Sequence, residues 1–371
     1  MTDLPVTKRE REAEATEKRA VAEERSPRGD LMIASCRSGL PLARRIVERL
    51  RVREEAERGD GERGTEVGFL EGIDTQFSDT ETVVRLDADV SGKDVFLLQA
   101  LYDPTSERGI DENYMAFFTA ARACREWGAN HVTAILPYLA YARQDKPSLS
   151  RREPTTAKLT ADFAIAAGID RLITWHPHLR QIHGFYGGTP LHVLDALGFF
   201  VEAYREYDGR EDVIMVAPDA GATKFVMACG RALDLSCAVG SKYRPRPEEA
   251  VLTDVMGDTA GKRVAIVIDD MISSGGTAEA LIQKLIEETE IEEVHLGVSH
   301  NLCLPAARER LEELHQAYHL QEVMVTNTIP QTEAFRSLPF LDVRDLSDVL
   351  ADVILRVHHN RPVSEMYQRI E

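Results

Sequence analysis

The segment Val264 to Thr277, VAIVIDDMISSGGT, carries the strongest local signal in the sequence. Its first residues, Val264 to Ile268, are apolar and mostly β-branched, which is typical of a short parallel strand buried on both faces. This strand is predicted to end at Asp269 and Asp270. A loop, Ser273 to Thr277, follows and leads into apolar residues at helical spacing. The segment therefore predicts a strand, a loop and a helix of an α/β fold.

The residues that follow this strand favour a sugar phosphate as ligand. Small residues between Ser273 and Thr277 allow backbone N–H groups to converge at a helix N-terminus, where the helix dipole also favours a phosphate. Asp269 and Asp270 would repel a phosphate alone, so they fit a ligand that also carries hydroxyl groups or binds a divalent cation. An ordinary structural turn is the alternative interpretation. The segment matches neither the Walker A pattern nor the dinucleotide-binding fingerprint.

The composition argues against several classes of protein. With 371 residues the chain is long enough for two domains, and 43% apolar residues are typical of a soluble globular protein. The net charge of -18 argues against nucleic-acid and membrane partners, because both need an exposed basic surface. The five cysteines lack Cys-x-x-Cys spacing, as expected for buried thiols in a reducing compartment. No long apolar run occurs, so a cytoplasmic location is expected.

Two series of alternating strands and helices organise the chain. Alternation over residues 31–188 and again over residues 189–350 predicts an α/β protein with two doubly wound parallel-sheet domains and a cleft between them. Residues 1–30 are densely charged and are expected to form a disordered tail, and the charged stretch 51–65 is expected to be a surface insertion. Residues 351–371 are expected to form a C-terminal helix and tail that pack back on the first domain.

Three local patterns add detail to this organisation. A buried strand is predicted to begin at His131 and to continue through HVTAILPYLAYARQD, residues 131–145. The alternation of polar and apolar residues around Thr82 to Leu86 predicts an antiparallel strand. A polar loop is predicted at Arg244 to Glu249.

A series of further motifs occurs along the chain: FSDTE (77–81), PYLAYARQD (137–145), REPTTAKL (152–159), HPHLRQIHGF (176–185), APDAGATK (217–224), SKYR (241–244) and VTNTIPQ (325–331). Together with the segment 264–277, and in this order, they resemble the ribose-phosphate pyrophosphokinases, also called phosphoribosyl-pyrophosphate synthetases. The resemblance extends from Leu31 to the C-terminus, apart from the charged insertion. It implies domains of phosphoribosyltransferase type and a transferase of nucleotide biosynthesis. The implied reaction moves the β,γ-pyrophosphoryl group of ATP to the C1 hydroxyl of ribose 5-phosphate, giving phosphoribosyl pyrophosphate and AMP.

The resemblance also implies roles for individual residues. Those implied for ribose 5-phosphate are Asp269, Asp270, Ser273, Ser274, Gly275, Gly276 and Thr277. Those implied for ATP are Arg143 and Gln144, together with Phe77, Asp79 and Glu81 from a neighbouring subunit. A shared pocket implies a homo-oligomer built from dimers, with a hexamer as one alternative. The implied metal positions are His178 and Asp219, with Mg2+ as the cation and Mn2+ or another divalent cation as the alternative. Lys242 and Arg244 match a catalytic pair on a mobile loop that closes over the triphosphate, where cations stabilise developing charge.

One departure from the family pattern leaves two interpretations open. Where the family usually has Asp-x-His, this chain has His176, Pro177 and His178. If the chain continues extended after the strand, both imidazole rings face the same side, and His176 as a ligand would shift metal preference from magnesium toward manganese, cobalt or zinc. The alternative is that His176 only makes hydrogen bonds to neighbouring groups.

Two other functions remain as alternatives to an active synthetase. A catalytically impaired homologue that regulates a true synthetase is expected to lose the loop cations, whereas this chain keeps Lys242 and Arg244. A phosphoribosyltransferase would use the same phosphate loop, but it needs only one such domain and none of the motifs assigned to ATP.

Overall fold

The computed structural model describes residues 26–57, 67–147, 152–246 and 249–366. The predicted disordered tail, apart from residues 26–30, and residues 58–65 of the predicted insertion therefore lie outside the described residues. All five cysteines have free thiols, and Cys237 is the one that is incompletely buried, in agreement with the expected buried thiols. Among the described helices, none has the length and apolar composition that a membrane span requires.

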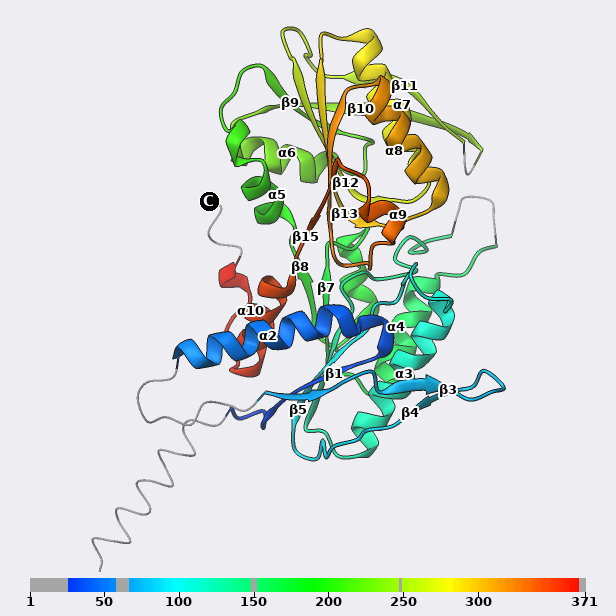
Figure 1. Cartoon of the computed structure of the whole chain (residues 1–371), viewed down its shortest axis with the longest axis vertical. Helices are drawn as coiled ribbons and strands as arrows, with labels where there is room; N and C mark the ends of the chain where they lie inside the picture. Colours follow the sequence, from blue (N-terminus) through cyan, green and yellow to red (C-terminus); the bar gives the residue numbers. More distant parts are fainter. Residues whose placement is uncertain (1–25, 58–66, 148–151, 247–248, 367–371) are drawn as a thin grey trace, which may run out of the picture.

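The first sheet is parallel throughout and has the strand order β2, β1, β5, β6, β7, β8 (Figure 1). Its strands are β1 (Leu31–Ser35), β2 (Gly68–Leu70), β5 (Asp94–Leu98), β6 (His131–Ile135), β7 (Arg171–Trp175) and β8 (Leu191–Leu194). Helix α2 (Leu40–Glu57) packs on one face, and α3 (Ile110–Glu126) and α4 (Thr156–Ala167) pack on the other. Successive strand residues point to opposite faces, so Phe96 joins the core with α2 and Leu97 joins the core with α3.

The second sheet has the order β11, β10, β9, β12, β13, β14, β15, and its pairs are parallel except for β10 with β11. Its strands are β9 (Val213–Ala217), β10 (Ser236–Arg246), β11 (Glu249–Met256), β12 (Val264–Ile272), β13 (Glu293–Asn301), β14 (Leu320–Thr326) and β15 (Leu341–Arg344). Its helices are α5 (Leu197–Ala203) and α6 (Thr223–Ala232) on one face and α7 (Gly276–Glu288) and α8 (Pro305–Ala317) on the other. A single turn, α9 (Glu333–Arg336), precedes β15.

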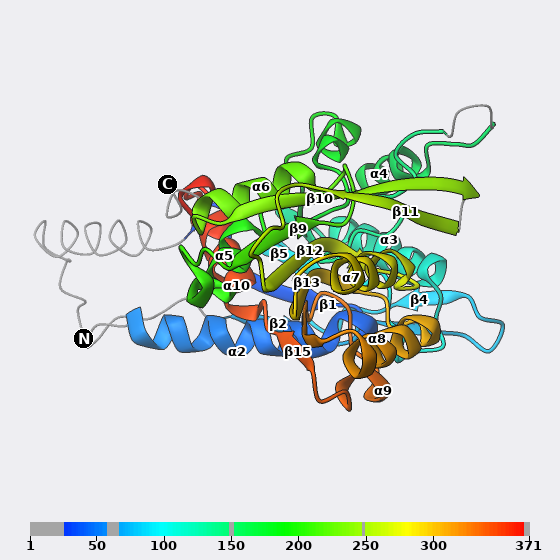
Figure 2. The same ribbon diagram turned by 90° about the horizontal axis from the view of Figure 1, so that it is seen from above.

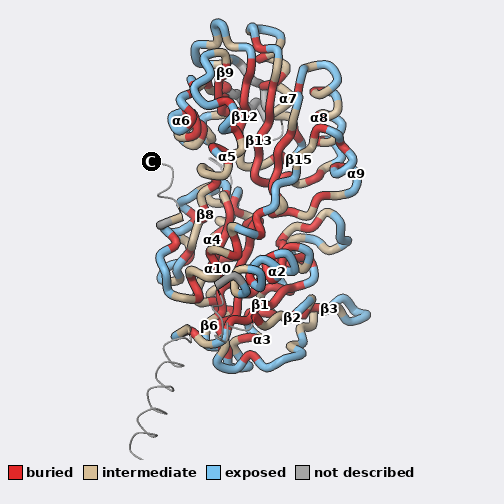
Figure 3. The backbone as a smooth tube through the Cα atoms, turned by 60° about the vertical axis from the view of Figure 1, so that its left-hand side comes forward, coloured by how far each residue is buried: buried red, intermediate tan, exposed pale blue. Residues whose placement is uncertain are grey.

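The chain returns to the first sheet at its C-terminal end. Helix α10 (Ser347–His358) packs against α2, and the two helices lie side by side in Figure 1. The buried His358 bonds to Asp94 at the start of β5, with 2.9 Å between Nδ1 and Oδ2. The strands of both sheets form the buried interior of the molecule in Figure 3, with exposed helical faces and loops around them. Strand β8 lies beyond residue 188 and belongs to the first sheet; the predicted domain limits stay a prediction.

The structure confirms the predicted fold class, a two-sheet α/β protein with mostly parallel strands. It also confirms the buried run Val264 to Ile268 in β12 and the antiparallel strand near Thr82, since β4 (Thr82–Val84) pairs with β3 (Asp74–Gln76). Short edge strands β8 and β15 carried too weak a pattern to be predicted, because an edge strand needs little apolar sequence.

Two local predictions are wrong. The strand predicted to begin at His131 ends at Ile135, and the residues after it form turns that carry Arg143 and Gln144. In the described part of the polar loop predicted at Arg244 to Glu249, β10 continues to Arg246 and pairs with β11, whose first residue is Glu249. The backbone N–H and C=O groups of the two strands form hydrogen bonds with each other there, so polar side chains do not prevent strand formation. Figure 2 shows this hairpin extending beyond the body of the second sheet.

Candidate functional site

Two carboxylates lie at the carboxyl end of β12, inside the strand rather than after it. Pairing with β9 stops at Val267, whereas pairing with β13 continues through Asp269 to Ile272. Asp269 and Asp270 are therefore fixed by one neighbouring strand at the point where the other has ended. Both residues are half-buried. Ligands of open α/β sheets bind at this edge, outside the carboxyl ends of the strands.

The loop after β12 leads directly into a helix. Gly275 is the N-cap residue of α7, and its φ of 81° lies in the left-handed region that favours glycine. Gly276 begins the helix, and the N–H of Glu279 donates to the carbonyl oxygen of Gly275 over 2.9 Å. The first N–H groups of a helix have no partner within the helix. The loop Ser273 to Thr277 is thus placed at a helix N-terminus, where an anion is favoured.

A hydrogen bond joins the two halves of the site. Nδ1 of His178, which follows β7 of the first sheet, lies 2.6 Å from Oδ2 of Asp270 in the second sheet. This bond raises the pKa of His178, although partial burial of the ring opposes the shift. Burial would raise the pKa of Asp270, but the hydrogen bond and positive charge of His178 lower it to about 2. Asp270 is therefore the ionised member of the carboxylate pair.

Asp269 has the opposite character. Burial raises its pKa well above the usual range, and the adjacent charge of Asp270 raises it further. The charge of Asp219 contributes to the same rise. Carboxylates that follow β9 and lie at the end of β12 therefore both act on the pKa of Asp269. Oδ1 of Asp219 accepts from the N–H of Gly221 over 2.8 Å. Within the described ranges, no group of three or more His, Cys, Asp or Glu side chains is close enough to hold a metal ion by itself.

His176 does not point the way that an extended chain would place it. Its φ of 36° turns the backbone, and Nδ1 of its ring lies 2.6 Å from Oγ of Ser299. The ring packs against Phe225 with 4.6 Å between centroids, and burial lowers its pKa. The chain is not extended at His176, so the condition for two imidazole rings facing one side is not met; His178 bonds to Asp270 and His176 bonds to Ser299.

A buried polar network surrounds His176, and it was not predicted from the sequence. The indole N–H of Trp175 donates to Oγ of Ser299 over 3.2 Å. Nε2 of His300 lies 3.1 Å from the carbonyl oxygen of His176, and its Nδ1 lies 2.8 Å from Oγ1 of Thr328. Burial lowers the pKa of His300 to about 4. The polar residues in VSHN and VTNTIPQ, at the ends of β13 and β14, were the available signal.

Arg143 and Gln144 lie in an exposed turn on the first-sheet side of the site. The turn is closed by a bond of 2.8 Å from the N–H of Gln144 to the carbonyl oxygen of Tyr141, whose φ is 62°. Burial raises the pKa of Tyr138, Arg143 opposes this rise, and Asp270 adds to it. The positive charge of Arg143, from the first-sheet side, and the negative charge of Asp270, from the second sheet, therefore both act on Tyr138.

The remaining predicted residues lie on two hairpins. Phe77, Asp79 and Glu81 form the tip between β3 and β4, which projects from the body in Figures 1 and 2. The side chain of Phe77 is 49% exposed, and Oδ1 of Asp79 accepts from the N–H of Glu81 over 3.2 Å. Lys242 and Arg244 lie on β10, where the backbone of Lys242 pairs with Leu252. Their side chains fall outside what the structure describes.

Arg310 is a residue near the site that the sequence did not indicate. It lies on α8, and its Nη1 donates to the carbonyl oxygen of Ser274 over 2.6 Å. Its Nε lies 2.8 Å from Oε2 of Glu279 in the first turn of α7. A single arginine on an amphipathic helix carries no signal of this contact, since the loop is 36 residues away in sequence.

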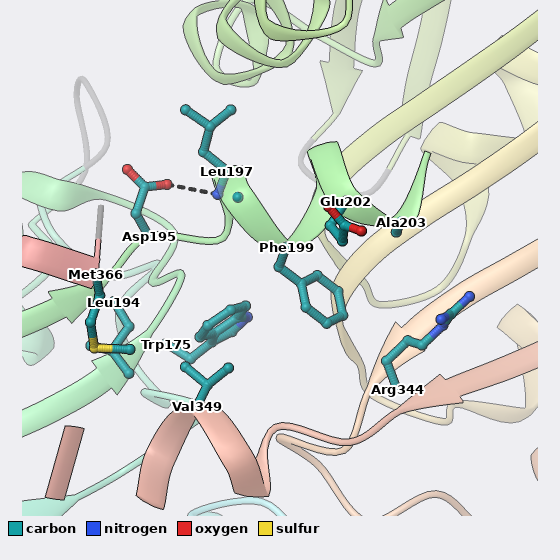
Figure 4. A pocket seen from close by; sticks show the side chains of 11 residues that line it. Trp175, Leu194, Asp195, Leu197, Phe199, Glu202, Ala203, Arg344, Val349 and Met366 are labelled. Atoms are coloured by element: carbon teal, nitrogen blue, oxygen red, sulfur yellow. Dashed lines mark hydrogen bonds between the residues drawn. The ribbon is translucent and has the colours of Figure 1, made fainter. Parts of the chain in front are cut away.

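A cavity of about 550 Å³ lies apart from these residues (Figure 4). Its lining is mainly apolar and includes Trp175, Phe199, Val349 and Met366, and none of the predicted site residues lines it. The indole of Trp175 links it to the polar network around His176, through Ser299. Volume alone is thus a poor guide to the chemistry here, because polar loops and strand ends hold the candidate residues.

Comparisons with known proteins give a consistent result. Residues 31–168 match the sequence model for the N-terminal domain of ribose phosphate pyrophosphokinase, and residues 218–368 match the model for the phosphoribosyl synthetase-associated domain. A ribose-phosphate pyrophosphokinase of Marinomonas sp. is 33% identical over 91% of this chain and 98% of its own length. One from Mycoplasma pneumoniae is 33% identical over 79% of this chain and 87% of its own. The crystal structure of phosphoribosylpyrophosphate synthetase from Mycobacterium smegmatis superposes with a TM-score of 0.75 and 30% identity, covering 89% of this chain and 99% of that one.

Proposed function

We propose how the residues of this chain, which belongs to the ribose-phosphate pyrophosphokinase family, divide the work of that family's reaction. The chain is a ribose-phosphate diphosphokinase: it transfers the diphosphoryl group of ATP to ribose 5-phosphate. In this reaction the C1 hydroxyl oxygen bonds to the β-phosphorus, the bond from that phosphorus to the oxygen of the leaving AMP breaks, and the hydroxyl proton is released. Catalysis of phosphoryl transfer consists mainly of positioning and of stabilising charge.

Ribose 5-phosphate is assigned to the carboxyl end of β12. Its phosphate would take the N–H groups of the loop Ser273 to Thr277, at the N-terminus of α7. Its ring hydroxyls would donate to Asp269 and Asp270. The support is positional, because the two carboxylates lie near the carboxyl end of β12 and the loop that follows turns into the helix at the left-handed Gly275.

A divalent cation, with Mg2+ as the first candidate, fits His178 and Asp219, with Asp270 beside them. Asp270 keeps its charge at neutral pH, since its pKa is about 2. The described residues offer too few ligands for a closed site, which suits Mg2+ because it binds through one or two carboxylates and the phosphates of a substrate. When bound, such an ion would neutralise charge on the phosphate oxygens. His176 is assigned a structural role, since Ser299 and Phe225 already hold its ring.

ATP is assigned to the first-sheet side. Arg143 and Gln144 would contact the nucleotide from their exposed turn. Phe77, Asp79 and Glu81 would complete the adenine pocket of a neighbouring subunit, and this role requires a homo-oligomer. The large exposed fraction of Phe77 at a projecting tip supports it, because an aromatic ring of this size is usually buried or at an interface.

Lys242 and Arg244 are assigned to the transition state. Both lie on the hairpin of β10 and β11, which extends beyond the second sheet. Positive charge brought to the triphosphate would stabilise the negative charge that develops between the β-phosphorus and the departing AMP.

The contact between His178 and Asp270 carries this proposal, because it brings the residues assigned to ATP and metal next to those assigned to the sugar. The test is an assay of AMP formation from ATP with magnesium ions, with and without ribose 5-phosphate. We expect AMP only when ribose 5-phosphate is present. Release of ADP or of free phosphate instead, or no turnover with any divalent metal, would contradict the proposal.

A further inference from the structure

We propose that Arg310 is a positioning residue for the phosphate loop, an inference that rests on the function proposed above. One guanidinium group joins two parts of the loop and helix, since Nη1 donates to the carbonyl oxygen of Ser274 and Nε pairs with Glu279. Ser274 directly precedes the left-handed Gly275, and Glu279 lies in the first turn of α7. Arg310 itself lies on α8, a helix that comes after the next strand of the sheet, β13.

The bond to Ser274 fixes the direction of one peptide group. The described residues contain no cis peptide bond, and in a planar trans peptide the C=O and N–H groups point in opposite directions. The carbonyl oxygen of Ser274 points to Arg310 on α8. The N–H of Gly275, which belongs to the same peptide, must therefore point away from the Arg310 guanidinium group. An inverted peptide would instead present a carbonyl oxygen on that side and repel a phosphate.

Packing keeps this arrangement in place. A Cβ atom on Gly275 would lie 3.4 Å from Cα of Ala307 and 3.6 Å from Cδ of Arg310. Ala307 is fully buried in the first turns of α8. The loop thus rests on the backbone of α8 at Ala307, and the side chain of Arg310 covers it one turn further along. A Cβ atom on Gly276 would lie 3.9 Å from Nη1 of Arg310, so the guanidinium group lies beside both glycines.

Charge gives Arg310 a second effect. Glu279 places a carboxylate in the same helical turn that is assigned to the phosphate. The Arg310 guanidinium lies 2.8 Å from this carboxylate, so the pair brings no net negative charge to the phosphate site. Without Arg310, Glu279 and the phosphate of the substrate would repel each other.

The first experiment measures kinetics and binding of Arg310→Ala. We expect the KM for ribose 5-phosphate to rise by about tenfold or more, the effect of losing one charge-assisted hydrogen bond. The KM for ATP and kcat at saturating ribose 5-phosphate should stay within about twofold of wild type, since the loop binds only the sugar phosphate. Calorimetric titration with ribose 5-phosphate should show the same loss of affinity without turnover.

A matched control comes from the same helix. Arg308 also makes an ion pair, with 2.9 Å between its Nη2 and Oε1 of Glu312, but within α8 and without contact to the loop. Arg308→Ala should leave the KM for ribose 5-phosphate unchanged. Arg310→Lys should recover part of the lost affinity, because an ammonium group keeps the charge but cannot reproduce the forked geometry of two bonds.

A double variant separates orientation from charge. Glu279→Gln added to Arg310→Ala removes the repulsion but not the loss of the Ser274 contact, so we expect only partial recovery of affinity. Full recovery would overturn the orienting role. Affinity of Arg310→Ala within twofold of wild type, or an equal rise of both KM values, would overturn the whole inference while leaving the proposed function intact. Wild-type protein that neither binds nor uses ribose 5-phosphate would overturn both.

Discussion

Strands β5 and β12 have the same place in their sheets but end in different ways. Each lies between the strand of its sheet that comes first in the sequence and the strand that follows it in the sequence. Strand β5 pairs with β1 and β6, and β12 pairs with β9 and β13. After β5, residues 99–109 lead to α3, whose N-cap is Gly109 with φ of -75°. The side chain of Glu112 accepts from the N–H of Gly109 over 2.7 Å. The start of α3 is thus occupied by a carboxylate of the chain itself.

After β12 the connection is shorter and has no such carboxylate at its N-cap. The N-cap residue of α7 is Gly275, and Glu279 is engaged with Arg310. The comparison teaches that position in a doubly wound sheet does not make an anion site. Under the proposed function, the N-terminus of α7 is left for the phosphate, whereas the N-terminus of α3 is occupied by the side chain of Glu112.

The two sheets also differ in their outer strands and in the residues at their strand ends. The outer neighbour of β1 is the short β2, whereas the outer neighbour of β9 is β10, which continues into the hairpin with β11. Strand β6 ends in the buried apolar Ile135, whereas β13 ends in the buried polar Ser299, His300 and Asn301. The second sheet therefore carries polar groups at positions where the first has only packing.

The largest effect is expected on the hairpin that the first sheet lacks. Lys242→Ala should lower turnover on the order of 10²-fold or more and leave ribose 5-phosphate binding nearly unchanged, because its charge is needed mainly in the transition state. Steady-state kinetics and calorimetric titration check the two parts. Arg244→Ala should behave similarly. Near-wild-type turnover in either variant would show that the hairpin has no catalytic role.

The next prediction compares the two helix starts directly. Gly275→Ala forces a side chain into a left-handed backbone against Ala307, which should cost about 1–2 kcal/mol and raise the KM for ribose 5-phosphate on the order of tenfold. The counterpart Gly109→Ala lies in an ordinary backbone region, where the new Cβ would make an ordinary contact of 3.7 Å with Oε2 of Glu112. It should cost less than about 1 kcal/mol and leave both KM values unchanged. Equal effects of the two substitutions would remove the distinction drawn between the helix starts.

A pH experiment tests the polar end of β13. The pKa of His300 is about 4 in the folded protein and about 6.5 when unfolded, so between these values the unfolded state binds a proton that the folded state does not. Stability should therefore be complete above about pH 6.5 and fall on the order of 3 kcal/mol by about pH 4. Urea unfolding at several pH values should show this loss in wild type and a flatter profile in His300→Gln. Identical profiles would contradict the role of His300.

The smallest effect is expected at His176. His176→Asp restores the residue usual in the family, yet the ranking of magnesium, manganese, cobalt and zinc in the AMP assay should not change, because the His176 ring bonds to Ser299 and packs on Phe225. His178→Asp is the matched variant and should change that ranking, since an oxygen ligand replaces an imidazole nitrogen. A new ranking in His176→Asp would show that His176 binds the metal after all.

The sequence by itself determined the elements that have a strong local pattern. The run Val264 to Ile268 is a buried strand, as predicted. The helix predicted after the loop Ser273 to Thr277 is α7, because the 3.6-residue period is a property of neighbouring positions. The motif strings also indicated the family, which the comparisons show. The site residues they suggested stay predictions.

Tertiary structure alone decided which of those residues meet. His178 and Asp270 are 92 positions apart and come from different sheets, and Arg310 reaches Ser274 from another helix. The turn at His176 depends on a φ of 36° that no local pattern predicts, and Phe225 and Ser299 hold the ring from the second sheet's side. Periodicity reports burial and backbone type along the chain, whereas a contact between distant side chains depends on how two sheets are placed and on which faces they share.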